Sequence, residues 1–144
     1  MIRIPKVRTL GFSLIELMVT VSIVGVLASI AYPSYLAYTR RSNRTDATSA
    51  MVHDAQMLER CYSQTFSYIG CPNVPTTATP TPNGYYSVLV ATPAAAQFTI
   101  TATPAKSPQT GDTQCSTFTM GSGGVQTATD AGGALTTSVC WGSK

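Results

Sequence analysis

The sequence predicts an α+β protein in which one long N-terminal helix packs on a small antiparallel β-sheet. Two patterns predict this fold. An apolar run over residues 12–39 leads into an amphipathic segment over residues 40–62, and residues 63–144 hold short alternating segments between turn residues. The 144 residues suffice for one domain with a modest core. A helix on one face of a sheet buries both apolar surfaces.

Residues 1–11 form a short basic leader, and residues 12–39 are apolar except for Glu16. Residues 17–39 contain no charged side chain, and at about 1.5 Å per residue they span roughly 34 Å of helix. This length is close to the hydrocarbon thickness of a bilayer, which is about 30 Å. The sequence therefore predicts that this segment crosses a membrane.

Three interpretations of the apolar segment are open. A secretory signal would be cleaved near Ser29–Ala31, and a plain signal anchor would stay in the membrane. Neither explains Glu16, because a charge at mid-bilayer costs about 2.5–3.5 kcal/mol, and less near the interface. Cleavage between Gly11 and Phe12 explains it. The new α-amino group then lies four positions before Glu16, and the two charges can pair within one helix or between staggered helices.

The helix is expected to continue beyond the membrane, with an apolar stripe that packs on the sheet. The stripe consists of Ala47, Met51, Ala55, Leu58 and Tyr62, and the charged positions outside it are Arg44, Asp46, Asp54, Glu59 and Arg60. Pro33 removes one backbone hydrogen bond, so we expect a helix kink near Ser29. We expect Arg40, Arg41 and Arg44 to form an interfacial anchor beside the membrane.

Short strands follow the helix. They are expected at residues 85–90, 97–103, 116–120, 125–129 and 135–141. The second segment alternates cleanly, with Phe98, Ile100 and Ala102 facing the core and threonines facing outward. Residues 72–82 contain four prolines and are expected to form an irregular loop. The outward hydroxyl faces suit either solvent or contact with another subunit.

All four cysteines follow the apolar segment, and an even number in such a domain predicts disulfides. Four cysteines allow three connectivities. We favour Cys61–Cys71 and Cys115–Cys140, because each pair closes a loop within one region of the chain. Oxidised cysteines place the head, residues 63–144, in the periplasm and the leader in the cytoplasm.

The small number of charged residues and their distribution along the chain argue against several functions. Only 10% of residues are charged, against about 25% in a typical soluble domain. Arg3, Lys6 and Arg8 lie in the leader, and the remaining Lys/Arg and Asp/Glu balance, so we expect neither an acidic partner nor nucleic acid. The single histidine, His53, supports no catalytic or zinc site. We therefore predict no catalytic residues, no metal, no cofactor and no enzyme activity.

Residues 11–19 (GFSLIELMV), after a basic leader and before Pro33, resemble the cleavage and methylation site of type IV prepilins. The resemblance implies that a prepilin peptidase cuts after Gly11 and N-methylates the Phe12 amine. It implies that Glu16 sets the assembly register by meeting the Phe12 ammonium of a neighbouring subunit. The implied partners are other major and minor pilin subunits, the prepilin peptidase, the inner-membrane pilus assembly machinery and, before assembly, the membrane.

The resemblance implies a pilin fold and a structural subunit of a type IV pilus that supports pilus assembly, twitching motility or adhesion. Such a subunit sits in the inner membrane with its N-terminus in the cytoplasm and becomes extracellular on assembly. The four cysteines and the closing Cys140-Trp141 resemble minor pilins more than abundant ones.

Two alternative functions stay open. A pseudopilin of a type II secretion system shares the leader and Glu16, but its usual calcium loop has no counterpart, because Asp112 and Asp130 are isolated in the sequence. A DNA-uptake pilin would need a basic face, which few positions of the mature head offer. These positions are Arg60, Lys106 and Lys144.

Overall fold

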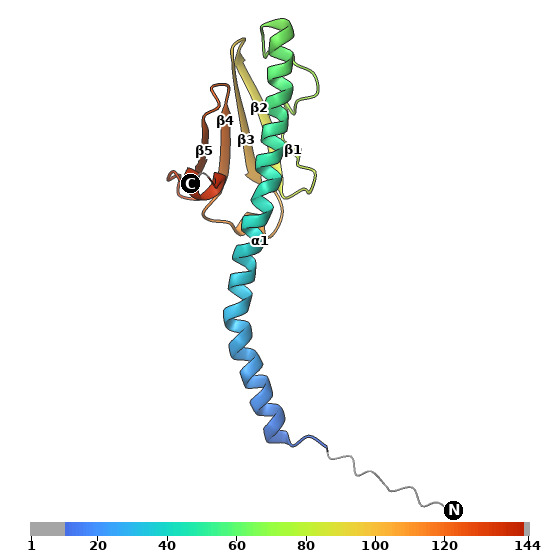
Figure 1. The fold of residues 1–144 in the computed structure, drawn as a ribbon, viewed down its shortest axis with the longest axis vertical. Coiled ribbons are helices and arrows are strands. Elements are labelled where there is room, and N and C mark those ends of the chain that lie inside the picture. Colours follow the sequence, from blue (N-terminus) through green and yellow to red (C-terminus); the bar gives the residue numbers. More distant parts are fainter. Residues whose placement is uncertain (1–10, 143–144) are drawn as a thin grey trace, which may run out of the picture. The chain divides into compact units, whose positions relative to one another are not determined.

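The computed structural model describes residues 11–142, and Figure 1 shows the order of its elements. The chain forms two compact units, one ending at Tyr35 and one beginning at Leu36, and each is considered by itself. One helix is followed by five strands, which confirms the predicted α+β fold. The elements are α1 (Leu14–Thr65), β1 (Thr79–Pro80), β2 (Tyr86–Ala94), β3 (Gln97–Pro104), the 3₁₀ helix η1 (Gln109–Gly111), β4 (Thr117–Gly121), β5 (Gln126–Thr129) and α2 (Thr137–Trp141).

Ser13 lies just before the first helix and caps its N-terminus. Its side-chain Oγ accepts a hydrogen bond from the backbone N–H of Glu16 at 3.2 Å, as a helix-capping serine does. Further along, Thr20, Ser22 and Ser29 donate their hydroxyl hydrogens to carbonyls one turn back, at 2.7–2.8 Å. These polar groups are therefore satisfied inside the helix itself. α1 continues without a break past Pro33, and the kink expected there stays a prediction.

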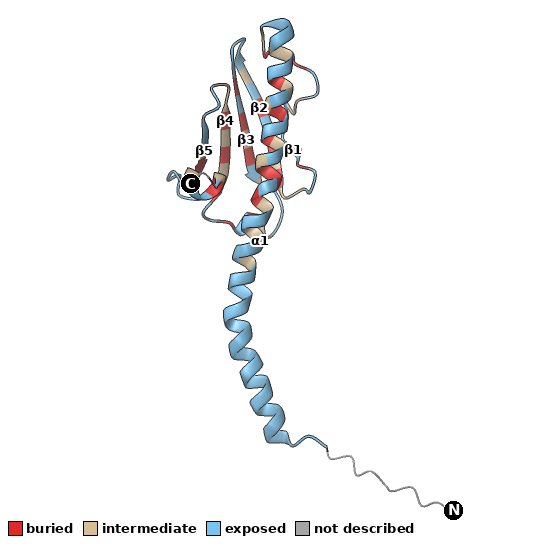
Figure 2. Ribbon diagram, in the orientation of Figure 1, coloured by how far each residue is buried: buried red, intermediate tan, exposed pale blue. Residues whose placement is uncertain are grey.

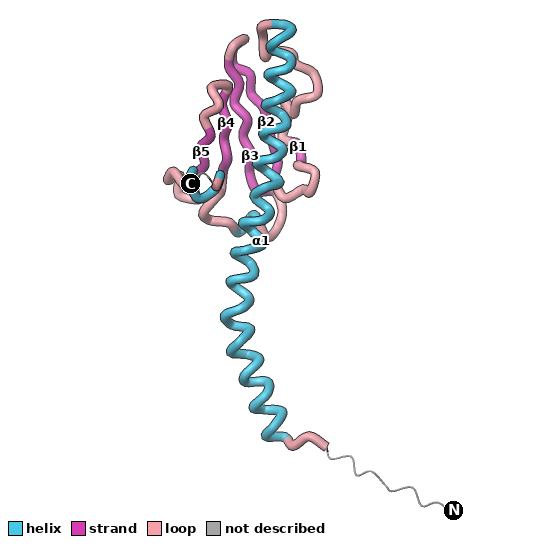
Figure 3. The backbone as a smooth tube through the Cα atoms, viewed as in Figure 1, coloured by secondary structure: helices cyan, strands magenta, loops and turns pink. Residues whose placement is uncertain are grey.

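The second unit contains the core of the head. Five antiparallel strands lie in the order β1-β2-β3-β4-β5, and the part of α1 from Leu36 onward covers one face (Figures 1 and 3). Ala47, Met51 and Leu58 of the helix are fully buried against the sheet (Figure 2). The facing strand residues are Tyr86, Val88, Val90, Phe98, Ile100, Ala102, Phe118, Met120 and Ala128.

The strand register follows the side-chain alternation. Ile100 of β3 lies opposite Val90 of β2 and Met120 of β4, so three core-facing residues form one row across the sheet. This pairing fixes the register, because a slip of β3 by one residue would turn its own core-facing side chains to the other face of the sheet. The expected inward set of β3, Phe98, Ile100 and Ala102, is confirmed.

The expectation of a last strand at residues 135–141 is wrong. Leu135 makes one isolated bridge to Thr129, and Thr137–Trp141 then form the short helix α2. The Thr137 Oγ1 accepts from the Ala128 N–H at 3.1 Å, and the Trp141 Nε1–H donates to the Thr127 carbonyl at 2.9 Å. Residues four apart are separated by about 6 Å along a helix but by about 13 Å along a strand. A helical turn therefore brings both side chains to neighbouring residues of β5.

Two further expectations need correction. The proline-rich segment contains a two-residue strand, β1, which pairs with Val88 and Ser87 of β2, so it is not irregular throughout. Three charged residues of α1 expected outside the apolar stripe are also buried. They are Arg44, Asp46 and Asp54. Two of them hold distant loops, which the spacing of apolar residues along a helix does not reveal.

Candidate assembly site

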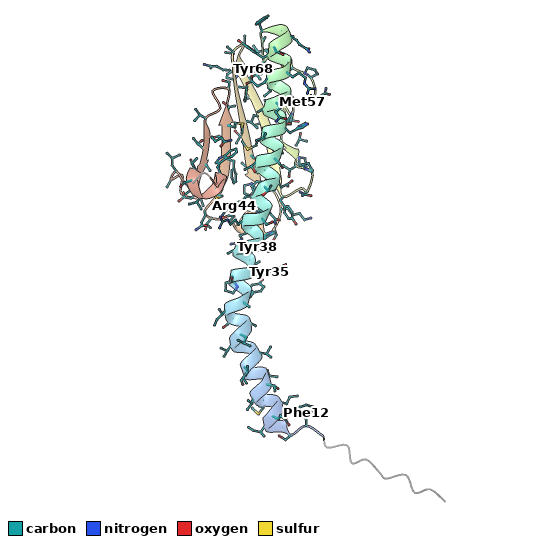
Figure 4. All side chains as sticks on the ribbon, in the orientation of Figure 1. Phe12, Tyr35, Tyr38, Arg44, Met57 and Tyr68 are labelled. Atoms are coloured by element: carbon teal, nitrogen blue, oxygen red, sulfur yellow. A yellow bond between two sulfur atoms is a disulfide. The ribbon has the colours of Figure 1, made fainter. Side chains whose placement is uncertain are left out.

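The predicted cleavage site lies in exposed, non-helical backbone. Gly11, Phe12 and Ser13 precede α1, all three are exposed, and the side chain of Phe12 is 79% exposed (Figure 4). A peptidase binds its substrate as extended chain, so the bond between Gly11 and Phe12 is suitably placed. Residues 1–10, with the rest of the predicted leader, lie outside the described residues.

Glu16 lies in the first turn of α1, where the positive end of the helix dipole favours a carboxylate. Among the described residues it has no ion-pair partner. Cleavage before Phe12 would create an ammonium group four positions earlier. The start of this apolar helix therefore presents one carboxylate that a new N-terminus, in the same chain or in a neighbour, can neutralise.

The first part of α1, residues 14–35, exposes every large apolar side chain that it carries (Figure 2). It is long and apolar enough to cross a membrane. Such a surface is stable only in lipid or against other apolar surfaces. The exposed residues are Leu14, Ile15, Leu17, Met18, Val19, Val21, Ile23, Val24, Val26, Leu27, Ile30, Tyr32 and Tyr35.

Arg44 forms a buried ion pair with Asp112, so the expected three-residue interfacial anchor is incomplete. The Arg44 Nε donates to Asp112 Oδ2 at 2.8 Å, and Nη2 donates to Oδ1 at 3.0 Å. This two-point geometry is the strongest that Arg and a carboxylate form. The pair joins α1 to the segment between η1 and β4 (Figure 4 labels Arg44). Arg44 is thus a structural residue of the head.

Asp46 holds the turn that precedes β2. Its two carboxylate oxygens accept hydrogen bonds from the Thr81 hydroxyl, the backbone and side chain of Asn83, and the Tyr85 N–H. A carboxylate with several such donors is well compensated for its burial. The left-handed backbone of Gly84, with φ of 70°, completes the turn between these donors.

Arg40 and Gln109 connect α1 to η1. The Arg40 Nε donates to the Pro108 carbonyl at 3.1 Å, and the Gln109 Nε2 donates to the Arg40 carbonyl at 3.1 Å. Gln109 also donates to the hydroxyl of Tyr86 at 2.7 Å. Burial raises the pKa of Tyr86, so its phenol stays neutral. Of the three arginines expected at the membrane surface, only Arg41 is free of such contacts among the described residues.

Two disulfides close the head. Cys61 pairs with Cys71 and Cys115 pairs with Cys140, with Cα atoms 5.9 and 5.7 Å apart. These are the pairs favoured from the sequence. The first ties the end of α1 to the following loop, and the second ties α2 to the start of β4.

Tyr68 lies inside the first disulfide loop and packs the loop onto the sheet (Figure 4). Its ring stacks on Tyr62 at 4.4 Å and meets Phe98 edge-on at 4.9 Å. Its hydroxyl donates to Glu59 at 3.0 Å. Burial and this hydrogen bond raise the pKa of Tyr68 to about 12. The loop is therefore held in place by an aromatic cluster as well as by its disulfide bond.

The outward face of the sheet carries hydroxyl groups in place of charges. Thr99 and Thr103 of β3 are exposed, and the hydroxyls of Thr119 and Thr127 meet across β4 and β5. From Cys61 to Ala105 the sequence has no charged side chain. A neutral hydroxyl face costs less to desolvate than one with lysine and glutamate when each group finds a hydrogen bond.

The sequence predicts roles for Gly11, Phe12, Glu16 and the cysteines, but it does not predict the contacts of Arg44, Asp46, Asp112 and Gln109. Arg44 and Asp112 are 68 positions apart, and no local pattern links them.

Two family models match the chain. "Type IV minor pilin ComP, DNA uptake sequence receptor" matches residues 33–119, more than half of the chain, and "Prokaryotic N-terminal methylation motif" matches residues 7–32. The second match contains Gly11, Phe12 and Glu16, where the exposed cleavage segment and the lone carboxylate lie.

Curated relatives match the N-terminal region. A fimbrial protein of Pseudomonas aeruginosa is 56% identical over 39 residues, which are 27% of this chain and 25% of that protein. The type IV major pilin PilA of Myxococcus xanthus is 48% identical over 40 residues, 28% of this chain and 18% of its own. The type IV major pilin PilE1 of Neisseria gonorrhoeae is 51% identical over 37 residues, which are 26% of this chain and 22% of that protein.

The matched region spans a quarter or less of these relatives, so the head is characterised by the family model and by its own structure. The model covers the part of α1 that packs on the sheet, strands β1 to β3 and most of β4. Together with the methylation motif and the helix-on-sheet head, this match shows that the chain belongs to the type IV minor pilin family.

Proposed function

We propose that this chain is a structural subunit of a type IV pilus, cut after Gly11, N-methylated on Phe12 and assembled through α1. The observation that carries the proposal is the first part of α1, an exposed apolar surface with one unpaired carboxylate at its start. Such a helix fits the inner membrane before assembly and the extracellular pilus afterwards. The partners are other pilin subunits, the prepilin peptidase and the inner-membrane assembly machinery.

The charge on Glu16 can set the stagger between neighbouring helices during assembly. Before cleavage, the carboxylate near the membrane surface lacks a counter-charge within the described chain. After cleavage, an ammonium at Phe12 supplies one. In a bundle of apolar helices, a stagger that separates the two charges leaves both unpaired in a medium of low dielectric, which is strongly unfavourable. The correct stagger is thus selected by electrostatics, while apolar packing supplies affinity.

Intact-mass spectrometry of the mature protein tests the processing. We expect loss of residues 1–11 and one added methyl group on Phe12. A mature N-terminus at Tyr32 would instead mean ordinary signal-peptide cleavage.

A variant with Glu16→Gln tests the assembly register. We expect normal membrane insertion, because the change removes a charge, but at least about tenfold less incorporation into sheared fibres, corresponding to about 1.4 kcal/mol or more. Glu59→Gln is the matched control, since Glu59 is an exposed glutamate on the part of α1 in the head. Equal incorporation of Glu16→Gln and Glu59→Gln would remove the register role.

We also consider a DNA receptor, because the matching family model carries that description. Within residues 36–142, five Lys/Arg face five Asp/Glu, and Arg44 is committed to Asp112. The exposed cations among them are Arg41, Arg60 and Lys106. So few phosphate contacts predict weak, strongly salt-dependent binding. Direct titration of duplex DNA at two salt concentrations tests this role, and the triple change of these cations to Gln should abolish any binding that they mediate.

A further inference from the structure

A cavity of about 530 Å³ lies in the head, between α1, the proline-rich segment and β2. Most of its walls are apolar, and Ala50, Val74, Pro75 and Val88 contribute to them. A volume of this size falls within the range of pockets that hold small molecules. The assembly site does not use this cavity, which lies wholly within the second unit.

Asp54 supplies a carboxyl group to this cavity, although the residue is only 8% exposed. Its single polar partner among the described residues is Nδ1 of His53, at 3.4 Å. That distance is long for a charge-assisted hydrogen bond, which is about 2.7–2.9 Å. The side chain of His53 is itself 69% exposed, so the contact gives Asp54 little compensation for lost water.

The other two buried aspartates of the head have more hydrogen-bond partners than Asp54. Asp46 accepts four hydrogen bonds, and Asp112 forms a two-point pair with Arg44 and also accepts from the Gln114 N–H. Both are saturated by the protein. Asp54 therefore stands out as a buried carboxyl group with acceptor capacity left over, next to an apolar space.

We propose that this cavity binds a small organic ammonium, with its cationic nitrogen on Asp54 and its apolar body against Ala50, Val74 and Val88. A cation with hydrogen-bond donors satisfies the carboxylate, and an apolar body removes the apolar walls from water. An uncharged ligand would fill the space and leave the carboxylate uncompensated. An anionic ligand would be repelled by the carboxylate of Asp54.

Binding should weaken in acid, because protonation removes the negative charge of Asp54. Burial raises the pKa of Asp54, so its carboxylate takes up a proton before an exposed aspartate does. His53 is the other titratable side chain that lines this cavity. The segments facing Asp54 from the proline-rich loop and β2 contribute no charged lining residue.

Benzylamine is a suitable probe, with benzyl alcohol as its uncharged match. Each is titrated into the full mature chain in nonionic detergent at pH 7.5, and NMR chemical shifts of Ala50, Val74 and Val88 are followed. We expect saturable shifts with benzylamine and at least about tenfold weaker ones with benzyl alcohol, as befits a charge-assisted hydrogen bond. Equal affinity for both probes, or no saturable shift with benzylamine, overturns the proposal.

Two variants test whether Asp54 provides the charge that binds the ammonium. Asp54→Asn keeps the shape of the side chain and should weaken benzylamine binding about tenfold or more, while leaving benzyl alcohol unchanged. His53→Gln leaves the carboxylate of Asp54 in place and should retain benzylamine binding at pH 7.5. Unchanged benzylamine affinity in Asp54→Asn would contradict the assignment. Because the two probes are compared on the unaltered protein, the test does not depend on either variant folding.

Discussion

Asp112 offers the clearest test of a single residue in the head. Changing Asp112 to Leu leaves the guanidinium of Arg44 buried without its partner, and we expect a loss of about 3–5 kcal/mol in unfolding free energy. Adding Arg44→Met should recover most of it, because apolar side chains of similar volume replace buried ion pairs at little cost. Denaturant unfolding in detergent measures both. Asp130→Asn is the control, since an amide oxygen can still accept from Gly132 and Ala134.

Asp54 should make the stability of the head depend on pH. Its folded pKa lies above the unfolded value near 3.9, so the native state holds the proton more tightly. Stability therefore falls as pH rises from about 4 through the raised folded pKa. Asp54→Asn cannot titrate, and we expect its thermal midpoint to exceed that of the unaltered protein at pH 7 and to match it near pH 3. A midpoint for Asp54→Asn below the unaltered one at pH 7 would show that the carboxylate is compensated after all.

The two disulfides can be compared as restraints on separate elements. They close separations of 10 and 25 residues. The chain-entropy model gives about 3 kcal/mol for a 15-residue loop, and the longer separation should add about 0.8 kcal/mol over the shorter one. Replacing Cys115 and Cys140 by serine should thus cost more stability than replacing Cys61 and Cys71. The reverse order, measured by thermal unfolding, would mean that the aromatic cluster around Tyr68 depends on its disulfide.

The elements that sequence predicts well are those whose signal is local. β3 alternates strictly, α1 is long and apolar or amphipathic throughout, and both appear as expected. Residues 135–141 have β-rich composition, yet they become a helical turn because two side chains four apart bond to β5. Arg44, Asp46 and Asp54 look like surface charges on a helical wheel. Arg44 and Asp46 are buried by contacts with segments 35 or more positions away, and Asp54 lines a cavity with loop residues 19 or more positions away. Long-range polar contacts leave no trace in local periodicity.

At the scale of the whole molecule, a minor subunit should be present in fibres at low copy number. Quantitative proteomics of sheared pili should find this chain at a small fraction of the most abundant pilin, with the cleaved N-terminus. An abundance equal to the main subunit would assign it as a major pilin. Absence from pili, together with presence in the inner membrane, would favour the pseudopilin alternative.

Three hydroxyl groups near the start of α1 have a consequence for polymerisation. Thr20, Ser22 and Ser29 each donate to a carbonyl of their own helix, so none of them relies on lipid, water or a neighbour. A subunit extracted from the bilayer can therefore exchange one greasy environment for another with its inventory of internal donors intact. Within the apolar run, Glu16 is the charged group that needs a counter-charge during this transfer, because it has no ion-pair partner among the described residues. The change of surroundings is therefore costly at the position that sets the stagger and not at these three hydroxyls.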